Sequence, residues 1–83
     1  MIYRLVYTKT AVKDIQKLDI VAKKRIRKKM EIFIKKPLFY SKKLINPAIG
    51  SFRFRIGNFR VVFDIDKDKI VVLRVGHRRE IYK

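Results

Sequence analysis

Residues 52–64 read FRFRIGNFRVVFD, and apolar side chains alternate with polar ones on both sides of a Gly57-Asn58 pair. Period-two alternation marks a strand that buries one face. Two such strands separated by a two-residue turn that contains glycine are typical of a β-hairpin. The pattern therefore predicts a hairpin whose phenylalanines face a core.

The opposite side of this hairpin carries a group of basic residues that we call the arginine face: Arg53, Arg55 and Arg60. A two-residue turn places Arg55 directly opposite Arg60, with Arg53 one step along. Like charges opposite each other destabilise a sheet. We therefore expect the arginine face to bind a polyanion, and a merely solvated sheet face is the alternative interpretation.

The start of the chain predicts a strand followed by a helix. Residues 2–7 (IYRLVY) are rich in β-branched and aromatic side chains, which favour strands. Thr8 or Thr10 can cap the next helix. Its apolar positions recur at helical spacing, and they are Ala11, Val12, Ile15 and Leu18.

A second helix is predicted after Asp19, which suits a cap, and Pro37 ends it. The short link between the helices indicates an antiparallel pair. Residues 37–50 contain two prolines and no clear period, so we interpret them as a loop. Three apolar side chains are expected to anchor it, namely Leu38, Phe39 and Leu44. The apolar stripe of the second helix comprises Ala22, Ile26, Met30, Phe33 and Ile34.

Residues 70–75 (IVVLRV) follow a polar turn and are nearly all apolar, which predicts a central strand covered on both faces. The predicted order is strand, two helices, then three antiparallel strands. Helices on one face of such a sheet give a two-layer α+β fold. With 83 residues, the chain is expected to form one domain over residues 1–83.

Composition narrows the possible partners. The formal net charge of +16 favours an anionic partner, which could be nucleic acid, an acidic protein or an anionic membrane surface. The chain has no cysteine and a single histidine, His77, so we expect neither a metal site nor a cofactor. No apolar run reaches the roughly 18 residues that span a bilayer. A cytoplasmic protein without membrane association is the expectation.

The segments GSFRFRIGNFRVVFDI and VGHRREIY, together with size, charge and element order, resemble the RelE/ParE toxins of type II toxin–antitoxin systems. The resemblance covers essentially the whole chain. It implies one of two activities, because RelE-like members are ribosome-dependent mRNA endonucleases and ParE-like members inhibit DNA gyrase. The basic positions and the terminal tyrosine favour a RelE-like enzyme that cleaves mRNA in the ribosomal A site. A cognate acidic, RelB-like antitoxin is also implied.

The resemblance implies a catalytic set: Arg53, Arg55, Arg60, His77, Arg78 and Tyr82. Arg53 and Arg55 stand where RelE-type enzymes carry two basic residues, usually lysines. Arg60 resembles the usual arginine of the next strand, and Arg78 that of a Gly-x-Arg ending. Tyr82 resembles the C-terminal tyrosine, at a shorter spacing from Arg78, and His77 stands where some relatives have histidine or lysine.

Metal-free RNA cleavage needs the 2′-hydroxyl deprotonated, the phosphate charge stabilised and the leaving 5′-oxygen protonated. Arginines bind phosphate oxygens well, but with a pKa above about 12 they are poor bases. His77, with an ordinary pKa of about 6.5, is a candidate acid or base, and Tyr82 could stack on a base or donate a proton.

Structural interpretations of these side chains stay open beside the catalytic ones. His77 could simply end a strand, Tyr82 could pack at the edge of the core, and Arg78 and Arg79 could be solvated. Three functions follow from the sequence: a ribosome-dependent mRNA endonuclease, a gyrase inhibitor without nuclease activity, and a plain nucleic-acid-binding module.

Overall fold

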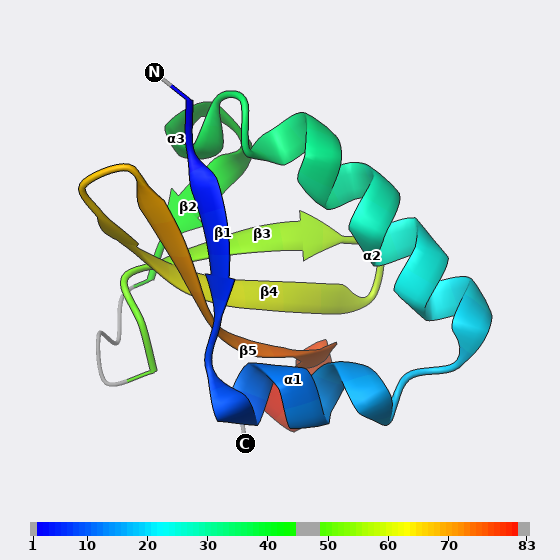
Figure 1. Cartoon of the computed structure of the whole chain (residues 1–83). Helices are drawn as coiled ribbons and strands as arrows, with labels where there is room; N and C mark the ends of the chain where they lie inside the picture. Colours follow the sequence, from blue (N-terminus) through cyan, green and yellow to red (C-terminus); the bar gives the residue numbers. More distant parts are fainter. Residues whose placement is uncertain (1, 45–48, 82–83) are drawn as a thin grey trace.

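The computed structural model of the protein describes residues 2–44 and 49–81 (Figure 1). A strand and two helices come first, and the strands of a sheet follow. The elements are β1 (Arg4–Tyr7), α1 (Lys9–Gln16), α2 (Ile20–Phe33), α3 (Pro37–Tyr40), β2 (Ser41–Lys43), β3 (Phe52–Ile56), β4 (Phe59–Asp66), β5 (Lys69–His77) and α4 (Arg78–Ile81).

The strands form one sheet in the order β1-β5-β4-β3-β2. β1 pairs in parallel with β5, and β3, β4 and β5 pair antiparallel in succession. β5 lies between β1 and β4, which confirms it as a central strand. Helices α1 and α2 contribute Ala11, Ile26 and Met30 to the core cluster on one side of the sheet. The two-layer α+β fold expected from the sequence is confirmed.

Both predicted helix starts are confirmed by side-chain caps. The Thr8 hydroxyl accepts a hydrogen bond from the backbone N–H of Ala11 at 3.1 Å. The Asp19 carboxylate accepts one from the N–H of Ala22 at 2.7 Å. Each bond satisfies a donor that would otherwise be unpaired in the first helical turn. Local sequence therefore fixes where α1 and α2 begin.

Aromatic side chains fill the core between α2 and the hairpin. The rings of Phe54 and Phe63 stack with centroids 4.2 Å apart, and both residues are fully buried. Phe33, at the end of α2, lies 5.0 Å from the Phe54 ring and 4.9 Å from the Tyr40 ring. Aromatic pairs at such distances add to the free energy gained from area burial alone. The phenylalanines of the hairpin are core residues, as predicted.

The prediction of a loop over residues 37–50 is wrong for its first half. Pro37 opens α3, where its missing N–H costs nothing, and residues 41–43 form the edge strand β2 beside β3. The strand sequence SKK has no apolar alternation, so only backbone pairing reveals it. Leu38 and Phe39 are 62% and 77% exposed, which overturns their prediction as core anchors, whereas Leu44 is half-buried.

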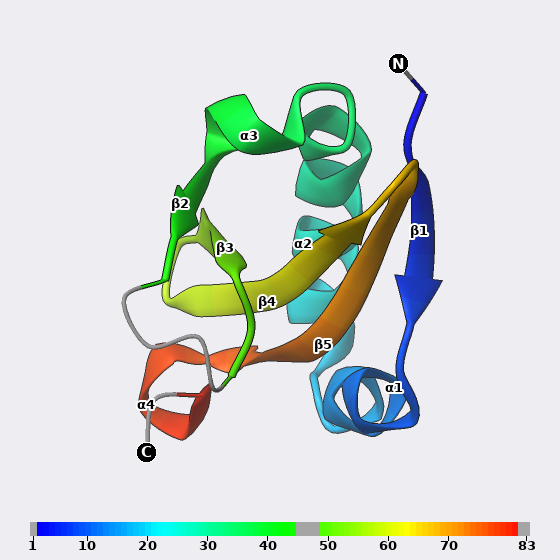
Figure 2. The ribbon, with the colours of Figure 1, turned by 90° about the vertical axis from the view of Figure 1, so that its left-hand side faces the viewer.

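The far side of the sheet, which Figure 2 turns toward the viewer with α2 behind it, is partly covered. Val62 is fully buried there, and a side chain on Gly50 would come within 2.6 Å of it. Ile81 of α4 packs over Gly76, close enough that a Cβ on this glycine would lie 3.3 Å away. The C-terminal segment, for which the sequence predicted no element, thus forms a short helix over one end of this face.

Candidate nucleic-acid interface

The hairpin has the register that the alternation predicts. Arg55 pairs with Arg60 and Ile56 with Phe59, on either side of a turn made by Gly57 and Asn58. Gly57 has a φ of +58°, a left-handed conformation that glycine adopts without the steric cost that a Cβ imposes. The turn residues therefore place the two arginines opposite each other.

Phe54 packs against Phe33 of α2, and because side chains alternate along a strand, Arg53 and Arg55 lie on the sheet face away from α2. The Arg55 side chain is exposed. Arg53 is half-buried between Val62 of β4 and Lys42 of β2, its neighbours on adjacent strands. Within the described residues, neither arginine has an acidic partner. These two members of the arginine face are therefore available to an anion.

Arg60 departs from the expectation of an open arginine face. It is only 5% exposed, and its Nη1 donates to the carbonyl oxygens of Gly57 and Phe59, both at 2.9 Å. The reason is tertiary: Arg60 pairs across the sheet with Gly76, the residue over which α4 packs. Arg60 thus holds the β3–β4 turn with a buried guanidinium.

The first residue of α4, Arg78, lies beside the same turn in space. The backbone N–H of Arg78 donates to the carbonyl oxygen of Asn58 at 2.8 Å, and the buried Ile81 fixes the other end of the helix. The side chains of Arg78 and Arg79 are exposed. Since Asn58 and Arg78 are joined directly, the structure brings Arg78 to the tip of the hairpin.

His77 lies on the other side of the sheet from the arginine face. It pairs with Phe59, and the two rings meet edge to face with centroids 6.0 Å apart. Its Nδ1 accepts the backbone N–H of Arg79 at 3.2 Å, so in its neutral form the proton sits on Nε2. A hollow of about 290 Å³ beside it is lined also by Lys17 and Glu80. The structure does not gather His77 with the arginines.

The predicted catalytic set is thus only partly assembled. Arg55 and Arg60 pair beside the β3–β4 turn, and the backbone of Arg78 bonds that turn at Asn58. Arg53 lies further along β3, and His77 faces the opposite side. Tyr82 lies outside the described residues, so its role stays a prediction.

A polar junction between α1 and β5 was not predictable from the sequence. Asp14 accepts hydrogen bonds from the Val75 backbone N–H at 3.0 Å and from Arg74 Nε at 2.8 Å. The hydrogen bond to Asp14 raises the pKa of Arg74 above its ordinary value. Because β1 pairs only with the first half of β5, Asp14 supplies a partner to the edge that β1 leaves open. Asp14 and Arg74 are too far apart in sequence for a local pattern to reveal the pair.

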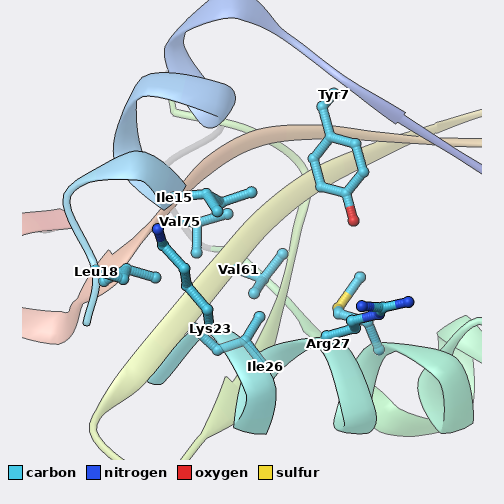
Figure 3. A pocket seen from close by; sticks show the side chains of 9 residues that line it. Tyr7, Ile15, Leu18, Lys23, Ile26, Arg27, Val61 and Val75 are labelled. Carbon is cyan, nitrogen blue, oxygen red and sulfur yellow. The ribbon is translucent and has the colours of Figure 1, made fainter. Parts of the chain in front are cut away.

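A groove of about 290 Å³ opens between α1, α2 and the sheet (Figure 3). Figure 3 shows Tyr7 reaching toward it from β1, with Lys23 and Arg27 projecting from α2. Burial raises the pKa of Tyr7 above its ordinary value of 10.0. The groove therefore combines an apolar floor with a cationic side. Its apolar lining comprises Ile15, Leu18, Ile26, Met30, Val61 and Val75.

The described residues, 2–44 and 49–81, lack both a membrane-spanning helix and a cluster of metal ligands. These residues contain no helix with the length and apolar character needed to span a bilayer. They also contain no cluster of three or more histidine, aspartate or glutamate side chains that could ligate a metal ion.

Comparisons with known proteins agree over nearly the whole chain. Residues 5–82 match the family described as "ParE toxin of type II toxin-antitoxin system, parDE". Toxin RelG of Mycobacterium tuberculosis is 33% identical over 90 residues, covering 100% of this chain and 99% of that protein. Toxin RelE3 of Methanocaldococcus jannaschii is 30% identical over 87 residues, covering 95% and 94%.

Solved structures show the same fold. A chain of the toxin–antitoxin complex RelBE2 from Mycobacterium tuberculosis matches with a TM-score of 0.83 and 30% identity, covering 94% of this chain and all of that one. A chain of the RelB–RelE antitoxin–toxin complex from Methanococcus jannaschii matches with a TM-score of 0.72 and 29% identity, covering 94% and 95%.

Proposed function

Since the chain belongs to the ParE toxin family of type II toxin–antitoxin systems, within the RelE/ParE superfamily, we propose that it is a ribosome-dependent mRNA endonuclease. It would cleave mRNA in the A site and so inhibit translation. The observation that carries this proposal is the arrangement of Arg55 and Arg78, two exposed arginines at one hairpin turn that have no acidic partner among the described residues.

The geometry suggests a division of roles among the predicted residues. Arg53, Arg55 and Arg78 bind the scissile phosphate and stabilise its developing charge, because guanidinium groups match phosphate oxygens. Arg60 holds the turn that positions Arg55 and Arg78, since its guanidinium is buried against the carbonyls of Gly57 and Phe59.

Proton transfer is the part of the reaction that arginines cannot perform, because they stay charged at any working pH. We assign it to Tyr82, which follows the arginines of α4 in the sequence, rather than to His77, which lies on the other side of the sheet from Arg53 and Arg55. With Nδ1 accepting the Arg79 N–H, neutral His77 offers Nε2–H as a hydrogen-bond donor to RNA, but a neutral imidazole is too weak an acid to protonate the leaving 5′-oxygen. Ribosomal RNA can supply further groups to the site.

The test is translation in a reconstituted system with purified protein, followed by mapping of mRNA ends. We expect cuts in the A-site codon, and we expect Arg55→Ala and Arg78→Ala to lower the cleavage rate by about 10². Lys28→Ala is the matched control, because it removes an exposed charge from α2 without touching the turn. Intact mRNA on ribosomes that carry the bound protein would refute the proposal.

A gyrase inhibitor without nuclease activity is the second candidate. The family description names ParE, and arginine stands at Arg53 and Arg55 where RelE-type enzymes usually carry lysine. A supercoiling assay separates the two candidates. Inhibition of gyrase by protein that leaves ribosome-bound mRNA whole would favour the ParE-like activity.

We also propose an acidic, RelB-like antitoxin as partner, since the similar structures include complexes described as RelB–RelE. Its amphipathic helix and extended segment would cross the helices and the arginine face. The groove suits an apolar side chain from such a segment, and Lys23 and Arg27 suit acidic residues beside it.

The antitoxin prediction compares two substitutions that introduce the same charge. Leu18→Glu places a carboxylate in the groove, whereas Ile20→Glu places one on α2 at a position that is 66% exposed. We expect Leu18→Glu to weaken the complex with the small acidic protein of the neighbouring reading frame at least roughly tenfold, measured by calorimetry, and Ile20→Glu to leave it unchanged.

Thermal unfolding of each variant alone shows whether Leu18→Glu still folds. A folded Leu18→Glu protein that binds the acidic protein with wild-type affinity would rule out the groove as the docking site. A neighbouring frame that encodes no acidic binder would count against the partner itself.

A further inference from the structure

Arg25 of α2 contacts the same hairpin turn from the other side of the sheet. A Cβ added to Gly57 would lie 2.9 Å from Arg25 Nη2, 3.1 Å from Cζ and 3.2 Å from Nη1. The Arg25 guanidinium therefore occupies the space that a side chain at position 57 would take. Figure 1 shows the end of β3 lying against α2 at this point.

A glycine at this position leaves room for the approach of Arg25. Gly57 has both a positive φ and no Cβ, and the Arg25 guanidinium lies where a Cβ would otherwise project. The Arg25 side chain is nevertheless exposed. The planar fork of an arginine is pre-organised, so an arginine loses less conformational entropy per hydrogen bond to an anion than a lysine does. Arg25 therefore differs from the other basic residues on the outer surface of α2.

Three arginines are thus tied to one turn. Arg25 lies beside Gly57, and Arg55 belongs to the Arg55–Arg60 pair, one step from the turn. The backbone N–H of Arg78 bonds Asn58 in the turn itself. In the part of the chain that the structure describes, the side chains of these arginines have no acidic partner. An anion at the turn therefore meets charges that nothing neutralises.

We propose that Arg25, Arg55 and Arg78 form a phosphate-binding site for single-stranded RNA that wraps around the β3–β4 turn. Arg25 holds a backbone phosphate on the helix side, outside the scissile position. The proposal deepens the proposed function and depends on it for the choice of RNA as the ligand.

RNA suits this site better than an antitoxin segment does. Planar guanidinium groups pair with phosphate oxygens through two parallel hydrogen bonds. The apolar groove lies on the flank of α2 that carries Arg27, and at about 100° per residue Arg25 projects from the opposite flank. The helix thus separates a cationic site from the apolar one.

The experiment measures binding without cleavage. The probe is a 2′-O-methyl oligoribonucleotide, which has no free 2′-hydroxyl to attack the phosphate, and fluorescence anisotropy follows its affinity across a salt series. We expect Arg25→Gln to weaken binding about tenfold and to reduce the slope of log affinity against log salt by about 0.7. Lys24→Gln and Lys28→Gln, exposed charges on the outer surface of α2, should each weaken binding less than about twofold.

A second readout separates binding from catalysis. If the protein cuts mRNA on ribosomes, Arg25→Gln should raise the half-saturating ribosome concentration and leave the maximal rate unchanged. If the protein does not cut, the proposed function fails while the anisotropy series still decides the role of Arg25. An equal loss for Arg25→Gln and Lys28→Gln, or a loss confined to antitoxin binding, would overturn the site.

Discussion

Arg60 shows how the same residue type can take different roles on one sheet face. Arg55, its cross-strand partner, is exposed. Arg60 is only 5% exposed, and its Nη1 donates hydrogen bonds to two carbonyl oxygens of the turn. A buried cation is costly unless hydrogen bonds compensate it. Its retention at this position fits a role in holding the turn that carries Arg55 and Arg78.

Replacing Arg60 therefore tests stability as much as activity. Arg60→Ala removes the donor to the carbonyls of Gly57 and Phe59, and we expect the free energy of unfolding to fall by about 2–3 kcal/mol. Urea denaturation measures this loss, and Arg55→Ala, at an exposed position of the same rung, should change it by less than about 0.5 kcal/mol. Equal, small changes for both variants would mean that Arg60 does not hold the turn.

At the scale of elements, the fold depends on junctions that close the ends of the sheet. β1 pairs with β5 only as far as Val72, and beyond that point Asp14 of α1 bonds the backbone of Val75 and the side chain of Arg74. β5 leads directly into α4, so this junction supports the strand that delivers Arg78 to the hairpin.

We expect Asp14→Ala to destabilise the protein by about 2–4 kcal/mol, because it leaves the Val75 N–H and the Arg74 guanidinium without their partner. Arg74→Ala should cost less, since the side chain of Arg74 is 36% exposed and that of Asp14 only 10%. Chemical denaturation of both variants provides the comparison. A larger loss for Arg74→Ala would contradict the view that Asp14 closes the strand edge.

The elements also show what sequence can predict. The helix caps at Thr8 and Asp19 and the hairpin register are local, and all were predictable from neighbouring residues. β2 was not, because its sequence is polar and its pairing with β3 is tertiary. The burial of Arg60 was hidden for the same reason, since it depends on α4 packing over Gly76.

At the scale of the whole molecule, few of the charged side chains form ion pairs with one another in the described residues. The ion pairs are Asp14 with Arg74, Glu31 with Arg27, and Asp68 with Arg4. The chain has 23 lysines and arginines against 7 acidic residues, so acidic side chains of the chain itself cannot pair most of its positive charge. Such a field draws polyanions of any sequence, which is why general RNA affinity alone says little about function.

Cleavage that follows the reading frame is the property that only ribosome-dependent action explains. The most direct measurement maps the cut ends of one mRNA on programmed ribosomes and free in solution, then repeats the mapping after moving the start codon by a single nucleotide. We expect no cut in free mRNA, and on ribosomes a cut that shifts with the frame and disappears with Arg78→Ala. Intact mRNA on ribosomes saturated with protein, or a cut that stays at the same nucleotide in both frames, would contradict this function.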